Sequence, residues 1–99
     1  MNTNDIIRQV ATLYGVTAED ITGGKRHRIF ADCRTVVCYV LHERCGLSST
    51  QIGDIINRTH ATVLYFIGKA HDWKRMPVLN RQGFAALRDM ERRIHRESA

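Results

Sequence analysis

Hydrophobic side chains recur every three or four residues along most of this chain, and no segment shows the alternation typical of a strand. This periodicity predicts a first helix over residues 5–14, with Asn4 as its N-cap and Gly15 as its C-terminal stop. Thr17 then begins a short capped turn that ends at residues 23–24. The N-terminal quarter is therefore expected to be helical.

A longer helix is predicted over residues 27–44, ended by Gly46. Its spacing turns one set of side chains inward: Phe30, Cys33, Val37, Val40 and Leu41. After Pro77, a last helix is predicted over residues 78–96, with an apolar stripe of Leu79, Phe84, Leu87, Met90 and Ile94.

Between these two segments, residues 48–51 match a capping box and begin a short helix that ends near Ile56. Residues 57–58 form a tight break, and Thr59 can cap a further helix that reaches about Trp73. The side chains expected to face the core from this second helix are Val63, Leu64, Ile67 and Ala70. The whole pattern predicts an all-α fold, a compact bundle of about six helices in a single domain over residues 1–99.

Two short helices joined by a turn of this length are the pattern of a helix-turn-helix, whose second helix enters the DNA major groove by its N-terminal end. A plain helical hairpin gives the same pattern, so the alternative stays open. Gly53 lies inside the first of the two helices, where glycine costs about 1 kcal/mol relative to alanine. A close helix crossing is one reason for a glycine there.

Composition is that of an ordinary globular domain: 99 residues, 43% hydrophobic and 25% charged, with one proline. The longest apolar run, near residues 36–41, is far shorter than a membrane span. No basic segment followed by an apolar one begins the chain, so no signal peptide is expected. These features predict a cytoplasmic protein that does not enter a membrane.

Charge narrows the class of partner. The net charge is +5 and the pI is about 9.6, values typical of proteins that bind nucleic acid. The excess lies in two segments: residues 25–34 carry four basic side chains against one acidic, and residues 74–99 carry seven against three. A basic face that is merely solvated remains the alternative.

Three cysteines without a secretion signal argue against a disulfide framework. Cys38, His42 and Cys45 have the spacing of one helix face, but no CxxC pair supplies a fourth zinc ligand, so buried apolar cysteines are the simpler interpretation. The histidines are scattered, and Ser48 and Ser49 lie in the capping box. No enzyme activity, metal or cofactor is therefore expected.

Candidate DNA-binding residues fall in two groups. The N-terminal end of the second helix offers Arg58, Thr59, His60, Ala61 and Thr62, whose polar atoms and methyl groups suit base edges. A flexible basic loop offers Lys25, Arg26 and Arg28, and arginines on such a loop can enter a narrow minor groove. Arg34 and His42, further along the long helix, are expected to reach phosphates.

Other partners fit parts of the pattern. A helical protein-interaction module would present Cys38, Tyr39 and Trp73 to a partner. An RNA-binding role would use the same charge, although aromatic side chains for base stacking are few. Binding that does not respond to salt would favour a protein partner over nucleic acid.

The order of elements, the segment Ile-Gly-Asp-Ile-Ile-Asn-Arg-Thr-His-Ala-Thr-Val-Leu over residues 52–64 and the loop Lys-Arg-His-Arg over residues 25–28 resemble the C-terminal DNA-binding domain of DnaA, the bacterial chromosomal replication initiator. The similarity covers residues 6–71 and leaves the last helix outside. It implies a Trp-repressor-like helix-turn-helix that recognises an A/T-rich DnaA box in double-stranded DNA. The recognition helix would lie in the major groove and the loop arginine in the adjacent minor groove.

The resemblance assigns roles residue by residue. Arg26 matches the minor-groove arginine, and Arg34 and His42 fall where the family's long helix contacts the DNA backbone, although the second position is usually Lys. Arg58, His60 and Thr62 match the family signature, in which Arg precedes Asp-His-Thr-Thr-Val-Leu.

Three departures fall on the surface that contacts bases. Thr59 replaces the signature Asp, Ala61 replaces its first Thr, and Asn57 stands where the family has Gly-Gly. The fold is thus expected to transfer better than the target sequence, and a regulator or mobile-element protein with a target other than the DnaA box is the alternative. No ATP-binding loop occurs, so this chain is expected neither to hydrolyse ATP nor to open an origin by itself.

Overall fold

The computed structural model describes residues 1–98 and is all-helical over that range, which confirms the predicted fold class. Six α-helices and one 3₁₀ turn follow in the order α1 (Thr3–Tyr14), α2 (Ala18–Thr22), α3 (Arg28–Glu43), α4 (Ser49–Ile56), α5 (His60–Arg75), η1 (Pro77–Leu79) and α6 (Arg81–Ser98). Within these residues, no helix combines the length and the apolar character that crossing a membrane requires.

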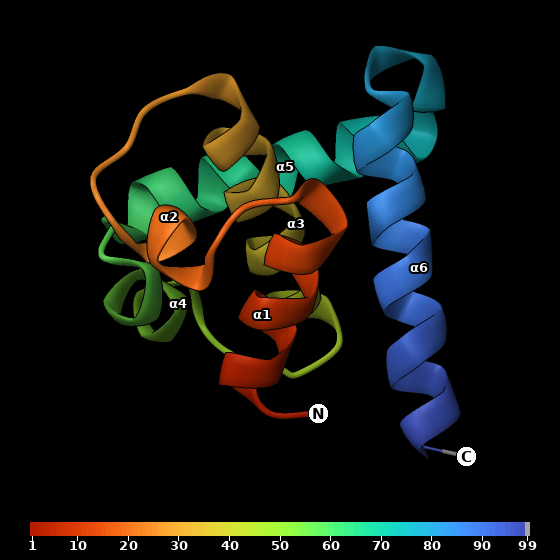
Figure 1. Cartoon of the computed structure of the whole chain (residues 1–99), viewed down its shortest axis with the longest axis horizontal. Helices are drawn as coiled ribbons and strands as arrows, with labels where there is room; N and C mark the ends of the chain where they lie inside the picture. The colour runs from red at the N-terminus through yellow and green to blue at the C-terminus, as the bar shows by residue number, and fades with distance from the viewer. Residues whose placement is uncertain (99) are drawn as a thin grey trace.

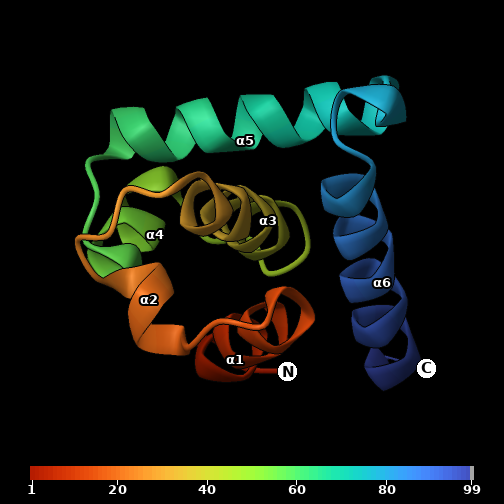
Figure 2. The same ribbon diagram turned by 45° about the horizontal axis from the view of Figure 1, so that its top comes forward.

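The central helix is α3, which packs against all five other α-helices (Figure 1). Figure 2 shows α5 lying across one side of α3 and α1 on the other, with α2 and α4 gathered where α5 begins and α6 standing where α5 ends. The fully buried large side chains come from every α-helix: Ile6, Val10, Ile21, Val36, Val37, Val40, Leu41, Ile52, Ile56, Val63, Leu87 and Met90. One core thus joins the two ends of the molecule.

Local capping signals account for where several helices begin. The predicted capped turn at Thr17 and the predicted capping box at Ser48 both form. The Thr17 hydroxyl accepts from the Asp20 amide at 3.1 Å, and the Ser48 hydroxyl accepts from the Gln51 amide at 3.1 Å. Gly15 ends α1 in the left-handed conformation, as expected.

The first cap differs from the prediction. Asn2, not Asn4, caps α1, because its side-chain oxygen accepts from the Asp5 amide at 2.8 Å. The helix therefore begins at Thr3, and Asn4 lies inside its first turn.

One of the four side chains predicted to face the core from α5 is exposed, and Phe66 and Trp73 are buried in addition to the other three. Leu64 is 52% exposed, whereas Phe66 is buried beside Ile67. Successive residues on a helix are rotated by about 100°, so the stripe through Val63, Phe66, Ile67 and Ala70 leaves Leu64 just beyond its edge. On α3, Phe30 is only half-buried, while the other predicted inward side chains are buried.

The last helix begins later than predicted. The Asn80 side-chain oxygen accepts from the Gly83 amide at 2.8 Å and caps α6, while Pro77–Leu79 form a separate 3₁₀ turn. Leu79 is consequently 53% exposed instead of lying on the buried stripe of α6.

A three-residue charge cluster fastens α6 to the bundle. Lys74 donates to both carboxylate oxygens of Glu91, at 2.9 and 2.8 Å, and Arg44 forms an ion pair with the same carboxylate. Partial burial raises the pKa of Glu91, but the hydrogen bonds from Arg44 and Lys74 outweigh it and hold the pKa below its ordinary value. Glu91 is therefore ionised and links α6 to α5 and to the end of α3.

Candidate nucleic-acid interface

A tight turn of residues 57–59 joins α4 to α5. Asn57 adopts the left-handed conformation, with φ 59° and ψ 48°, and ends α4. The Arg58 amide donates to the Gly53 carbonyl at 3.0 Å, and the Thr59 hydroxyl accepts from the Thr62 amide at 3.3 Å, which begins α5. The predicted tight break and the predicted Thr59 cap are both confirmed.

Gly53 is required by this turn. A Cβ atom at Gly53 would overlap the carbonyl oxygen of Arg58 and lie 3.6 Å from the carbonyl carbon of Thr59. The close approach that was expected from another helix therefore comes from the backbone of the turn itself. Any side chain at this position would push the start of α5 away from α4.

The recognition turn, defined here as residues Thr59–Thr62, presents its polar atoms at the surface. Thr59, His60 and Ala61 are exposed, and Thr62 is half-buried. The hydroxyl oxygens of Thr59 and Thr62 lie 3.1 Å apart and share a hydrogen bond. Directly behind them, Val63 is fully buried and anchors the turn to the core, as predicted.

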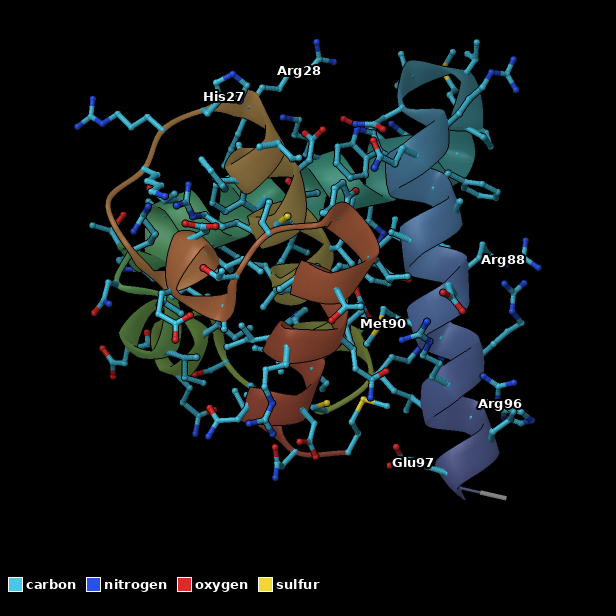
Figure 3. The ribbon with its side chains drawn as sticks, in the orientation of Figure 1. His27, Arg28, Arg88, Met90, Arg96 and Glu97 are labelled. Atoms are coloured by element: carbon cyan, nitrogen blue, oxygen red, sulfur yellow. The ribbon has the colours of Figure 1, made fainter. Side chains whose placement is uncertain are left out.

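The basic loop, defined here as residues 24–28, is exposed along its whole length. Figure 3 shows the side chains of His27 and Arg28 projecting from the loop away from the bundle. Lys25 lies 2.6 Å from the Asp20 carboxylate, and this hydrogen bond lowers the pKa of Asp20 to about 2. Within residues 1–98, no carboxylate forms a salt bridge with Arg26 or Arg28, so their charges are open to an outside partner.

The base of the basic loop is hydrogen-bonded to the turn of the helix pair. The Asn57 side chain donates to the Thr22 carbonyl at 3.1 Å, and the Arg58 guanidinium donates to the Gly23 carbonyl at 2.8 Å. Figures 1 and 2 both show the loop running past the start of α5. The two segments predicted to contact DNA therefore lie side by side, although 35 residues separate the hydrogen-bonded partners.

Arg34, predicted from the sequence to contact phosphate, lies where the base of the basic loop meets α3. Its side chain is only 3% exposed and donates to three backbone carbonyls: Ile21 at 2.7 Å, Asp20 at 3.1 Å and Gly23 at 3.2 Å. Burial, and then the nearby charge of Arg58, lower the pKa of the Arg34 guanidinium. The last carbonyls of α2 have no helical donors, and the guanidinium supplies them. A phosphate contact by Arg34 stays a prediction, and it would require the side chain to leave these carbonyls.

Arg58 has a similar inward role. Besides Gly23, its guanidinium donates to the carbonyls of Ile56 at 3.1 Å and Asn57 at 3.0 Å, and the residue is half-buried. We define the carbonyl junction as the carbonyls of residues 20–23 together with the side chains of Arg34, Asn57 and Arg58. It supports the basic loop and the recognition turn at once.

His42 lies on α3 toward its C-terminal end. Its Nδ1 is 2.9 Å from the Leu47 carbonyl oxygen, which can only accept, so Nδ1 carries a proton. A phosphate could then accept a hydrogen bond only from Nε2 of the doubly protonated ring. Contact between this residue and DNA stays a prediction.

Asn57, noted in the sequence only as a departure from the family signature, connects the turn to the base of the basic loop. It is the one non-glycine residue with positive φ in the described chain, and its amide reaches the Thr22 carbonyl. The available signal was its residue type, because Asn tolerates the left-handed conformation better than most side chains do.

The residues proposed to face a protein partner lie in the core. Tyr39 and Trp73 are 5% and 3% exposed, and Cys38 is fully buried, so that form of the interaction-module hypothesis was wrong. Burial raises the pKa of the Cys38 thiol to about 12, and Cys45 is exposed. Within residues 1–98 no three His, Cys, Asp or Glu side chains are grouped in a way that could hold a metal ion.

A short helix and a longer one joined by a glycine-dependent turn, with an exposed first turn on the second helix, define a helix-turn-helix domain. The chain belongs to the bacterial dnaA protein helix-turn-helix family, whose model matches residues 3–69.

Two relatives show how far the likeness extends. The chain is 41% identical over 59 residues, 60% of its length, to chromosomal replication initiator protein DnaA 1 of Chlamydia pneumoniae. It is 33% identical over 85 residues, 85% of its length, to chromosomal replication initiator protein DnaA of Roseiflexus castenholzii. The aligned segments are 13% and 18% of those proteins, so the chain spans a small part of its relatives.

Proposed function

We propose that this chain binds double-stranded DNA with sequence preference, in a process related to replication initiation or its control. The observation that carries the proposal is the carbonyl junction, which holds the basic loop beside the recognition turn. Membership of the dnaA helix-turn-helix family supports it, as do the names of the relatives. The proposal requires no cofactor and no catalytic step.

In this proposal each exposed side chain has a distinct task. His60, Ala61 and Thr62 lie in the major groove, where imidazole, methyl and hydroxyl groups suit base edges. Arg26 enters the adjacent minor groove, and Lys25 and Arg28 contact phosphates. The further candidates are Thr59 for bases and His42 for the backbone, whereas Arg34 and Arg58 position the other residues through the carbonyl junction.

Replacing two of the three loop cations separately tests the groove assignment. Arg26→Ala is expected to weaken binding most on A/T-rich duplexes, because a narrow minor groove concentrates negative potential. Lys25→Ala is expected to weaken all duplexes about equally and to lower the slope of log K against log salt by about 1. Fluorescence anisotropy with A/T-rich and G/C-rich duplexes over a range of salt concentrations measures both effects.

Two outcomes contradict these assignments. Equal losses for Arg26→Ala on both duplexes would mean that the loop is only a basic patch. Absence of duplex binding by the wild type at low ionic strength would remove the proposed function altogether.

The departures from the family signature predict a weak or altered preference for the DnaA box. Thr59 has no carboxylate to accept a hydrogen bond from a cytosine amino group, and Ala61 has no hydroxyl. Each lost base contact costs about 1–3 kcal/mol of discrimination, while backbone contacts are unaffected. Thr59→Asp with Ala61→Thr is expected to restore part of the preference, measured by competition between a DnaA-box duplex and a scrambled duplex at fixed salt.

Neither substitution is expected to disturb the fold. Asp is as good an N-cap as Thr, so α5 keeps its start, and residue 61 is exposed, so a threonine meets no neighbour in the core. Strong discrimination by the wild type that survives His60→Ala and Thr62→Ala would show that the recognition turn does not contact bases. A preference for a different sequence would instead favour a regulator with its own target.

A further inference from the structure

Helix α6 lies outside the family match at residues 3–69, and it carries five arginines and three acidic side chains. Its acidic side chains are occupied: Glu91 by Lys74 and Arg44, Asp89 by Arg93 at 3.0 Å, and Glu97 by the N-terminal amine. The buried face, which includes Leu87 and Met90, holds the helix to the bundle. What α6 leaves on the outside is positive.

The outward side chains form a regular row. Arg88, Arg92 and Arg96, here called the arginine row, are exposed and recur every four residues, so each stands about 6 Å further along the helix than the one before. Figure 3 shows Arg88 and Arg96 pointing away from the bundle, on the side opposite Met90. Among residues 1–98, Arg92 is the only one of the three with a carboxylate within salt-bridge range: its guanidinium lies 3.9 Å from the Asp89 carboxylate.

The arginine row borders a hollow of about 710 Å³ between α6 and the ends of α3 and α5. Phe84 forms part of its wall and is covered by the Arg88 guanidinium, 5.7 Å from the ring centre. Lys74 and Arg44 line it as well, and together they more than neutralise Glu91. The hollow and its rim therefore have a net positive charge.

This surface lies at the far end of the molecule from the recognition turn. His60 begins α5 and Lys74 is in its last turn, and a helix of 16 residues is about 24 Å long. Figure 2 shows α6 at the end of α5 opposite α4, and the arginine row faces away from the bundle. A duplex held by the recognition turn and the basic loop would leave the row uncovered.

We propose that the arginine row binds the phosphate backbone of a second DNA duplex, so that one molecule can bridge two DNA segments. A series of guanidinium groups on one side of a helix matches a polymeric anion, and arginine forms the two-pronged hydrogen bonds that phosphate accepts. All five strongly basic side chains of α6 are arginine and none is lysine. The bridging part rests on the proposed function, because the first duplex is bound at the recognition end.

The test first disables the recognition end and then asks whether duplex binding remains. The disabled variant replaces every side chain proposed to contact the groove or phosphates from the loop, together with one from the recognition turn: Lys25→Ala, Arg26→Ala, Arg28→Ala and His60→Ala. It is expected to keep salt-dependent binding of a short duplex of arbitrary sequence at about 50 mM salt. Adding Arg88→Gln with Arg96→Gln is expected to reduce that binding at least tenfold and to lower the slope of log K against log salt by about 2, at about 0.9 for each phosphate. Sedimentation of the wild type with excess duplex is expected to reveal complexes of one protein and two duplexes.

A matched control removes two charges elsewhere. Arg8 and Arg75 are exposed, and each pairs with an acidic residue on its own helix, so Arg8→Gln with Arg75→Gln gives the same net charge. In the same background this control is expected to change the affinity less than twofold. All four arginines are exposed, and thermal melting checks that each variant is folded.

Several results would overturn the proposal. An equal loss of affinity in the control variant would mean that only net charge matters. Complete loss of duplex binding with the recognition end disabled would mean that there is no second site, while the proposed function would still stand. Binding of poly-glutamate but not of duplex to the arginine row would assign the surface to an acidic protein. Failure of the wild type to bind any duplex would remove both proposals.

Discussion

Gly53→Ala is expected to destabilise the domain by about 1–2 kcal/mol and to abolish preferential DNA binding. The added Cβ atom would overlap the Arg58 carbonyl oxygen, which belongs to the backbone of the turn and cannot move aside as a side chain would. Overpacking of this kind costs about 1–3 kcal/mol, and the helical preference of alanine recovers less than that. Thermal and denaturant unfolding measure the stability, and anisotropy with the preferred and a scrambled duplex measures the binding.

Gly68 supplies the matched control, because it also lies inside a helix. A Cβ atom there meets nothing within 4 Å, and the residue is exposed on α5. Gly68→Ala is therefore expected to stabilise the domain by up to about 1 kcal/mol, from helix propensity alone. If both substitutions stabilise the domain equally, the turn can relax around a side chain, and the explanation given for Gly53 is incorrect.

Arg34→Ala is expected to cost about 3–5 kcal/mol of stability. The substitution leaves the buried Ile21 carbonyl without its donor and removes one donor from the Gly23 carbonyl. Unsatisfied buried carbonyls cost about 1–3 kcal/mol each, and loss of a buried charged partner reaches the upper end of single-residue effects. Arg34→Lys keeps the charge but cannot reproduce the branched set of hydrogen bonds, so an intermediate loss is expected.

The same variants separate a positioning role from a phosphate contact. If Arg34 positions the basic loop, Arg34→Lys is expected to lose both stability and preference for A/T-rich duplexes. In a double-mutant cycle, the effects of Arg34→Lys and Arg58→Ala on the free energy of unfolding are then expected to be coupled by about 0.5–3 kcal/mol. Arg8→Ala, at an exposed arginine, is expected to change stability by less than about 0.5 kcal/mol. A lower salt slope for Arg34→Ala with unchanged stability would restore the phosphate contact that the sequence suggested.

Local sequence signals determined most of the helix boundaries. The predicted caps at Thr17 and Ser48 and the predicted stop at Gly15 all form, because each depends on side chains three residues apart or on one backbone conformation. The Thr59 cap also depends on neighbours in sequence, so the helix pair could be placed from the sequence alone. The same local character explains the error at α1, where Asn2 and Asn4 were both suitable caps and only one is used.

Tertiary structure decided which arginine side chains are buried and which are exposed. Arg26, Arg34 and Arg58 are equally basic in the sequence, yet Arg34 is buried and Arg26 is exposed. The difference arises because α2 ends against α3 and the turn, where its last carbonyls need donors that no nearby residue in sequence supplies. Arg34 and Arg58, both predicted to contact DNA, therefore hold together the surface that presents Arg26. The physical reason is that a buried carbonyl must be paired with a donor, whereas an exposed guanidinium can be solvated by water.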